Sequence, residues 1–330
     1  MRPFAYAAPK STQQVIGLLG QDWTQAEILA GGTDLLALMK DDIVTPKRLV
    51  NLKEVAGLTH VGLGKDAFFI GALARLNDLA DHADIRKQFP MLAYALDEAA
   101  SPQIRNMATI GGNLCQRPRC WYFRNGFGLL AMKDGKSMVV EGDNQYHAII
   151  GNDGPAKFVT PSTIAPALIA YNAQLTIAGP KGIRDVPLAK FYRTPASETE
   201  REHDLQPNEI VTDILLPGKM PAPTHVAQYE IRQKQVFDWP LSLASVALWM
   251  DGNTVRQATI VLGAVAPVPW VSEEAAQAIV GKPINEQTAD AAGQAAVSIA
   301  KPLSRNQYKV QLTRVAVKRA LLQAAKGGQS

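Results

Sequence analysis

Short runs of apolar residues separated by turn residues predict many small elements in this chain. A helix is expected at residues 11–20, where Ser11 stands at the N-terminus, apolar residues lie on one side and Gly20 follows. Strands are expected at residues 27–30 and 48–52, with a helix between them at residues 35–40. These elements predict a βαβ-like unit that closes near residue 55.

Beyond residue 55 strands and helices are mixed, which predicts an α+β fold. Strands are expected at residues 68–72, 175–177, 181–186, 209–216 and 254–262, and helices at residues 76–83, 90–100, 273–280 and 308–325. Residues 241–250 form an apolar segment, and residues 217–223, rich in Pro and Gly, read as a linker. The expected division is therefore 1–55, 56–217 and 223–326.

Composition excludes several classes of protein. A chain of 330 residues exceeds the size of one efficient core, and 47% hydrophobic with 19% charged residues is ordinary globular composition. The net charge of +4 arises from 34 basic and 30 acidic residues mixed along the chain, which argues against nucleic-acid binding. No run approaches the roughly 18 apolar residues of a membrane span. Without a signal-like N-terminus, folding in the cytoplasm is expected, and export on a partner's signal stays open.

Two glycine pairs stand out as candidate ligand loops. Gly31-Gly32 lies at a strand-to-helix turn, and Gly111-Gly112 follows Thr109. Such pairs let the backbone approach a ligand closely and present N–H groups to a pyrophosphate. Either pair alone is equally well explained as a tight turn without a ligand. Neither fits the G-x-G-x-x-G pattern of a Rossmann site.

The segment 101–160 contains the only two cysteines, Cys115 and Cys120. They are too few for a disulfide scaffold or a four-thiolate metal site, and reduced structural thiols are the simplest interpretation. The five histidines show no metal-ligand spacing. Residues 111–148 contain no long periodic run, and connections of that length are usually functional.

Ordered motifs along nearly the whole chain resemble one known family. They are AGGTDLL, TIGGNL, QRPRCWYFR, GDNQYHAI, PLAKFY, LGAVAPVPW and the C-terminal YKVQLTRVAVKRAL. Together they resemble the FAD-binding subunits of the xanthine dehydrogenase, carbon monoxide dehydrogenase and aldehyde oxidoreductase group of molybdenum hydroxylases. The resemblance implies a two-part FAD-binding domain of the vanillyl alcohol oxidase-like (PCMH) type, followed by a small α+β C-terminal domain.

The resemblance also implies a cofactor site and partners. FAD would contact Ile28, Leu29, Ala30, Gly31, Gly32, Thr33, Asp34, Leu35 and Leu36 of the first loop, and Thr109, Ile110, Gly111, Gly112 and Asn113 of the second. The partners would be a molybdopterin-binding large subunit, which oxidises the substrate, and a [2Fe-2S] small subunit, which passes electrons to the flavin. This chain would then transfer electrons to an acceptor without oxidising substrate itself.

The CWYFR run resembles a subgroup whose flavin subunit carries an additional [4Fe-4S] cluster. Four thiolates or equivalent ligands would be required, and only Cys120 of the motif is present here. We therefore expect no [4Fe-4S] cluster in this chain, and a loop filled by apolar side chains such as Leu130 and Met138. Arg117, Arg119 and Arg124, clustered with aromatic residues, are expected at a subunit interface.

Two further departures from the family concern the flavin. Thr163 stands where the family has an Asp, and Glu230, ahead of Arg232, stands where it has a Lys. A carboxylate in place of a cation would lower the flavin potential or weaken FAD binding. A structural subunit with weak or lost FAD binding is therefore the alternative. A free-standing FAD oxidase is opposed by the lack of a substrate-cap domain.

Overall fold

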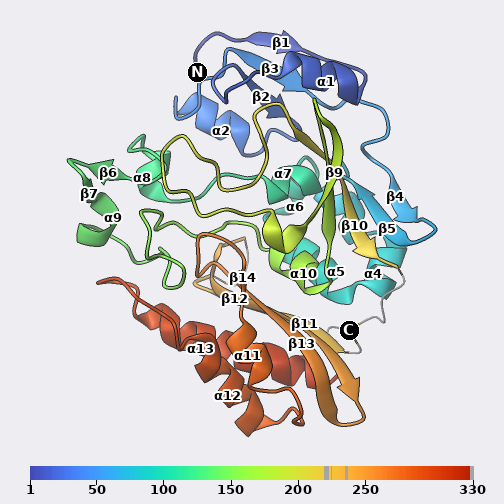
Figure 1. Cartoon of the computed structure of the whole chain (residues 1–330), viewed down its shortest axis with the longest axis vertical. Helices are drawn as coiled ribbons and strands as arrows, with labels where there is room; N and C mark the ends of the chain where they lie inside the picture. The colour runs from blue at the N-terminus through green and yellow to red at the C-terminus, as the bar shows by residue number, and fades with distance from the viewer. Residues whose placement is uncertain (219–222, 224, 235–236, 328–330) are drawn as a thin grey trace.

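The computed structural model describes residues 1–218, 223, 225–234 and 237–327 (Figure 1). It contains three main sheets that follow one another from the top to the bottom of Figure 1. The mixed helix and strand content confirms the α+β class. Within the described residues, no helix combines the length and apolar character that crossing a bilayer requires.

The N-terminal sheet is parallel and has the order β1-β3-β2. Its strands are β1 (Ala5–Ala7), β2 (Ala26–Leu29) and β3 (Arg48–Asn51), and its helices are α1 (Thr12–Leu18) and α2 (Leu35–Lys40). Ser11 caps α1, because its side chain accepts a hydrogen bond from the backbone N–H of Gln14. Val15 is fully buried and packs in one cluster with Val50. The expected βαβ-like start is therefore confirmed.

The central sheet is antiparallel, with the order β4-β5-β10-β8-β9. Its strands are β4 (Val61–Leu63), β5 (Ala67–Gly71), β8 (Gln174–Gly179), β9 (Gly182–Pro187) and β10 (Ile210–Pro217). The helices packed near it are α3 (Leu76–Ala80), α4 (Ala83–Gln88), α5 (Pro90–Glu98) and α10 (Ala165–Ala170). The helix expected at 76–83 is present as α3 but ends early, at Ala80, and the extended backbone of His82 separates it from α4.

Six short elements lie between residues 102 and 141, in the segment where the sequence showed no long periodic run and no elements were expected. They are α6 (Pro102–Arg105), α7 (Ile110–Leu114), α8 (Trp121–Arg124), β6 (Met132–Lys133), β7 (Lys136–Ser137) and α9 (Met138–Glu141). The β6–β7 hairpin and α9 lie at the left edge of Figure 1, away from the three main sheets. Leu130 is buried in a small cluster with Leu38, Phe123 and Phe158, whereas Met138 is half-buried.

The C-terminal sheet is antiparallel, with the order β11-β12-β13-β14. Its strands are β11 (His225–Arg232), β12 (Pro240–Asp251), β13 (Thr254–Gly263) and β14 (Trp270–Val271). Its helices are α11 (Glu273–Gln277), α12 (Glu286–Ala296) and α13 (Tyr308–Ala325). Helix α13 packs on β11 and β12, while α5 and α10 contact the sheet from the central region. The linker expected at 217–223 lies mostly outside the described residues.

Candidate functional site

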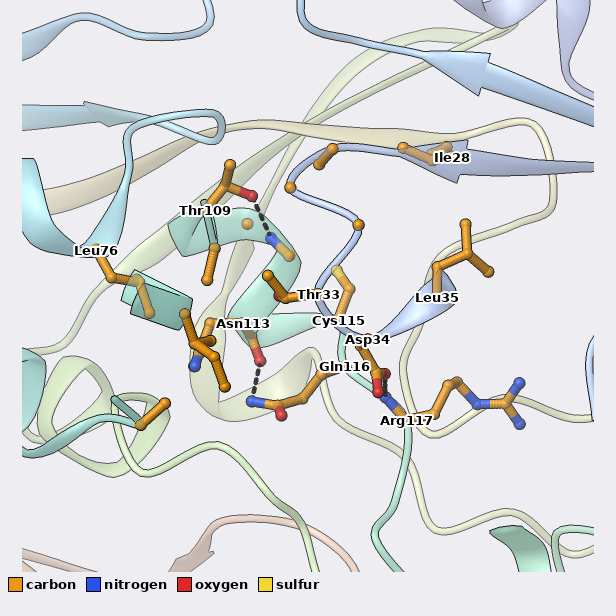
Figure 2. Close-up of a pocket in the computed structure, with 18 of the residues that line it drawn as sticks. Ile28, Thr33, Asp34, Leu35, Leu76, Thr109, Asn113, Cys115, Gln116 and Arg117 are labelled. Atoms are coloured by element: carbon orange, nitrogen blue, oxygen red, sulfur yellow. Dashed lines mark hydrogen bonds between the residues drawn. The ribbon is translucent and has the colours of Figure 1, made fainter. Parts of the chain in front are cut away.

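A cavity of about 590 Å³ lies between the two glycine loops (Figure 2). Its walls come from the turn between β2 and α2, from α7 and the residues that follow it, and from the ends of α5 and β11. Segments at 201–211 and 237–239 also contribute to the lining. The cavity thus combines residues from all three regions of the chain.

The first glycine loop leaves its backbone donors free. The five consecutive N–H groups from Gly31 to Leu35 donate to no protein acceptor among the described residues, although Leu36 N–H already bonds Gly32 O at 3.1 Å. Gly32 has a φ of +76°, which a residue with a side chain adopts at a cost. A Cβ at Gly31 would collide with the carbonyl of Met107. The loop therefore lies directly against the chain that leads into α7.

The second glycine loop has its donors occupied. Gly111 N–H donates to Ala72 O at 2.9 Å, and Asn113 N–H donates to Thr109 O at 2.8 Å. Gly112 N–H donates to Thr109 Oγ1 at 3.2 Å, which makes Thr109 the N-cap of α7 (Figure 2). A Cβ at Gly111 would lie 2.8 Å from the Cβ of Ala72. Here the glycine pair serves close packing within the protein.

Asn113 offers a side-chain donor to the cavity instead. Its Oδ1 accepts a hydrogen bond from the Ser162 hydroxyl at 2.6 Å, which fixes the orientation of the amide. Its Nδ2 donates to no protein acceptor among the described residues, and Asn113 lines the cavity. The amide can therefore donate to a bound ligand.

Asp34 joins the first loop to the segment after α7. Its Oδ2 accepts from Arg117 N–H at 2.9 Å (Figure 2). Its Oδ1 accepts from Arg124 Nη2 at 2.8 Å and forms an ion pair with Arg119 Nη1 at 2.9 Å. Arg117 also pairs with Glu202 at 2.8 Å. The three arginines expected at a subunit interface thus have partners within the chain.

Each arginine that lines the cavity within the described residues is paired with a carboxylate. The pairs are Arg117 with Glu202, Arg119 with Asp34, Arg201 with Glu27, and Arg232 with Glu98 and Glu230. The positive charge of the wall is therefore balanced before any ligand binds. A phosphate group would be recognised here more by directed N–H donors than by net charge.

Glu230 lies behind the cavity wall. Its side chain is 2% exposed and pairs with Arg232, and burial raises the pKa of Glu230. Arg232 lines the cavity, as does Thr163, whose carbonyl accepts from Gln228 Nε2 at 3.2 Å. The carboxylate of Glu230 therefore acts on the cavity through Arg232.

Most of the predicted site residues line the cavity. They are Ile28, Ala30, Gly31, Gly32, Thr33, Asp34, Leu35, Thr109, Gly111, Gly112 and Asn113. Three others do not line it. Leu29 follows Ile28 in β2, and strand alternation turns its side chain to the opposite face. Ile110 is fully buried in the main core, and Leu36 is 37% exposed on α2.

Several lining residues were missed by the sequence analysis. Arg201 lies over the Trp23 ring at 4.4 Å, and His203 stacks on Phe191 with ring centroids 5.5 Å apart. Burial, with Arg201 nearby, lowers the pKa of His203 to about 3. Arg201 and His203 lie in one loop before β10, which has neither periodicity nor a motif. Only the charged run Arg201-Glu202-His203 gave a signal in the sequence.

The two cysteines occupy different environments. Cys115 lines the cavity, and burial raises the pKa of its thiol to about 12. Cys120 Sγ lies 3.2 Å from His147 Nε2, outside the cavity lining. No group of three or more His, Cys, Asp or Glu residues suited to a metal ion occurs in the described part of the chain. The lack of a [4Fe-4S] cluster stays a prediction.

The fold and the cavity define a mixed α and β protein with a nucleotide-sized site built on two glycine loops. Residues 2–219 match the model of the FAD binding domain in molybdopterin dehydrogenase, and residues 227–324 match the carbon monoxide dehydrogenase flavoprotein C-terminal domain. The chain belongs to this family of FAD-binding oxidoreductase subunits, which confirms the resemblance seen in the sequence.

Individual relatives agree with this assignment over nearly the full length. The chain is 30% identical to the aldehyde oxidoreductase FAD-binding subunit PaoB of Escherichia coli (strain K12), covering 98% of this chain and 99% of that protein. It is 29% identical to the carbon monoxide dehydrogenase medium chain of Hydrogenophaga pseudoflava, covering 96% of each. The solved carbon monoxide dehydrogenase of Oligotropha carboxidovorans superposes with a TM-score of 0.78 at 25% identity, covering 99% of each chain.

Proposed function

We propose that the cavity binds FAD non-covalently, with the pyrophosphate on the first glycine loop. The observation that carries this proposal is the row of five N–H groups from Gly31 to Leu35 that lack a protein acceptor among the described residues. Backbone donors in a row form the concave site that phosphate oxygens prefer. Asn113 Nδ2 adds a donor from the opposite loop. The only cysteine of the lining, Cys115, is held protonated by its raised pKa, which disfavours a covalent flavin link.

Within this proposal six of the predicted residues have assigned roles. Gly31, Gly32 and Thr33 lie against the cofactor through their backbone, and Asn113 through its amide. Gly111 and Gly112 bring α7 close to Ala72, and so place Asn113. We further infer a two-part FAD-binding domain of the PCMH type at 1–55 and 56–217, with a C-terminal domain at 223–326; the sheet order and the matched family ranges support this division.

The chain serves, we propose, as the electron-transfer subunit of a heteromeric molybdenum hydroxylase. Bound FAD would supply a carrier between one-electron iron–sulfur chemistry and a further acceptor. The names of the relatives, a medium chain and a FAD-binding subunit, support a large molybdopterin-binding partner and a small [2Fe-2S] partner. An aldehyde, a xanthine or another aromatic compound would be oxidised in the large partner.

A structural subunit with weak FAD binding is the second candidate. The pairing of every lining arginine of the described residues with a carboxylate favours it, because no unpaired cation attracts the pyrophosphate. Thr163 at the lining adds no charge either. The free backbone donors of the first loop favour the electron-transfer function over this alternative.

The visible spectrum of the purified chain separates the two functions. Flavin absorption bands with about one FAD per chain are expected, and acid precipitation should release all of the flavin into the supernatant. Co-purification with two other polypeptides should accompany expression of the complete complex. A colourless chain that takes up no added FAD, yet still assembles with both partners, would establish the structural alternative. Flavin that stays with the acid pellet would contradict non-covalent binding.

A further inference from the structure

We infer that Arg119 is a further FAD-binding residue and that Asp34 positions it. This inference rests on the proposed binding of FAD in the cavity. It assigns Asp34 a different role from its neighbours in the first loop: its carboxylate faces the arginines and acts on the cofactor through one of them. The ligand group would be an oxygen acceptor of FAD that lies beside the first loop.

The first step is the direction of the Asp34 carboxylate. Both of its oxygens are occupied by the segment that follows α7, through Arg117 N–H and the guanidinium groups of Arg119 and Arg124. A carboxylate turned towards a pyrophosphate would be repelled by it. Occupied on both oxygens, Asp34 instead holds this segment at a fixed distance from the first loop.

The second step is the unmet hydrogen bond of Arg119. Its Nη1 pairs with Asp34 at 2.9 Å and its Nη2 donates to Gln116 Oε1 at 3.1 Å, but its Nε–H is buried and has no hydrogen-bond partner among the described residues. The guanidinium lies 4.9 Å from the centroid of the Trp239 ring, and both residues line the cavity. A buried donor of this kind is costly unless an acceptor satisfies it. A bound cofactor supplies oxygen acceptors at this wall.

Arg124 provides a matched control. It contacts the same Asp34 oxygen at 2.8 Å, and its Nε–H donates to Pro118 O at 2.8 Å. Arg124 does not line the cavity. Both arginines therefore pair with Asp34, but of the two only Arg119 has an Nε–H at the cavity without an acceptor among the described residues.

The test is FAD titration of the full-length apoprotein, followed by flavin fluorescence quenching. Arg119→Gln should weaken FAD binding roughly ten- to hundredfold, the effect of one hydrogen bond involving a charged group. Arg119→Lys keeps the positive charge without the planar Nε–H, so it should lose most of the same affinity. Arg124→Gln should change affinity less than about threefold, because Arg124 does not line the cavity.

A double-mutant cycle tests the role of Asp34. Asp34→Asn should weaken FAD binding, and Asp34→Asn combined with Arg119→Gln should bind no worse than Arg119→Gln alone, because Asp34 acts through Arg119. Additive losses would show that Asp34 touches FAD itself and would overturn the positioning role. Unchanged affinity in Arg119→Gln, full affinity in Arg119→Lys, or an equal loss in Arg124→Gln would overturn the role of the Arg119 Nε–H. A wild-type chain that takes up no FAD would refute the proposed function, and this inference with it.

Discussion

The two glycine loops share a sequence pattern and differ in what their backbones do. In the first, Gly32 has a positive φ and the N–H groups from Gly31 to Leu35 donate to no protein acceptor among the described residues. In the second, the pair lies within α7, and its N–H groups bond Ala72 O and Thr109 Oγ1. The first loop is thus built to meet a ligand, and the second to pack against the protein.

A glycine pair thus predicts that another group lies close to the backbone, but it does not indicate whether that group belongs to a ligand or to the protein. A helix N-terminus has unsatisfied N–H groups, but an N-cap such as Thr109 satisfies part of them internally. Asp34, at the start of α2, makes no such cap hydrogen bond, because its carboxylate is held by arginines. The same glycine pattern therefore leaves donors free in one loop and uses them in the other.

The largest effect is expected for Gly32→Val, which should abolish stoichiometric FAD binding. The positive φ disfavours a β-branched residue by about 1–2 kcal/mol, and the new side chain would meet Leu36 and Leu29 within 3.2 Å. The flavin-to-protein ratio measures the effect. Gly57→Val is the control, since Gly57 has a φ of +83° with no atom within 4 Å of a Cβ. Gly57→Val should lose similar stability and keep FAD. If Gly32→Val also kept FAD, the two glycine loops would not differ in their contact with the cofactor.

Gly111→Val should primarily destabilise the fold. Its Cβ would lie 2.8 Å from Ala72 Cβ and 2.9 Å from Ala72 O, so α7 must shift, at a cost of about 1–3 kcal/mol. FAD content should fall only because Asn113 and α7 move. Urea unfolding of the apoprotein measures the stability. Loss of FAD at unchanged urea midpoint would show that this glycine meets the cofactor directly, as the first loop does.

Acidification should release FAD through unfolding, because the backbone N–H groups of the two loops do not change protonation between neutral and acidic pH. Burial lowers the pKa of His147 to about 4, so the folded state resists protonation and stability is lost as pH falls from about 6.5 towards 4. His147 alone should contribute a loss on the order of 2 kcal/mol between about pH 7.5 and 5, and His203, with its pKa lowered to about 3, should add a similar loss. His147→Gln should reduce this loss and shift unfolding and flavin release together. Flavin release well before unfolding would show that a titrating residue of the cavity lining, such as His203, controls FAD binding directly.

Elements with a strong local signal were predictable from the sequence. The amphipathic α13 (Tyr308–Ala325) has the predicted ends, and Ser11 caps α1 as expected. Helix α10 was missed because its residues from Ala165 to Ala170 are all buried, which leaves no polar face to reveal a period. Helix α12 was missed because its buried face consists of small residues such as Ala289 and Ala292.

The cavity was only partly predictable for a related reason. The glycines carry a local signal, but the walls supplied by Arg119, Arg201 and Arg232 depend on which distant segments meet. The arginines that pair with Asp34 could not be predicted from the sequence, because they lie more than 80 residues away from it along the chain. Chemistry that depends on tertiary pairing leaves no periodic pattern.

The smallest effect is expected at Thr109, the residue that closes the second loop. Thr109→Ala removes the acceptor for Gly112 N–H and should destabilise the protein by about 1 kcal/mol, the usual value of an N-cap. Thr109→Ser keeps the hydroxyl and should restore most of that stability, as measured by urea unfolding. FAD affinity should change less than about threefold in either variant, because the hydroxyl is bonded within α7. A tenfold loss of affinity in Thr109→Ala at nearly unchanged stability would instead make this hydroxyl a cofactor ligand, and the second loop would then resemble the first.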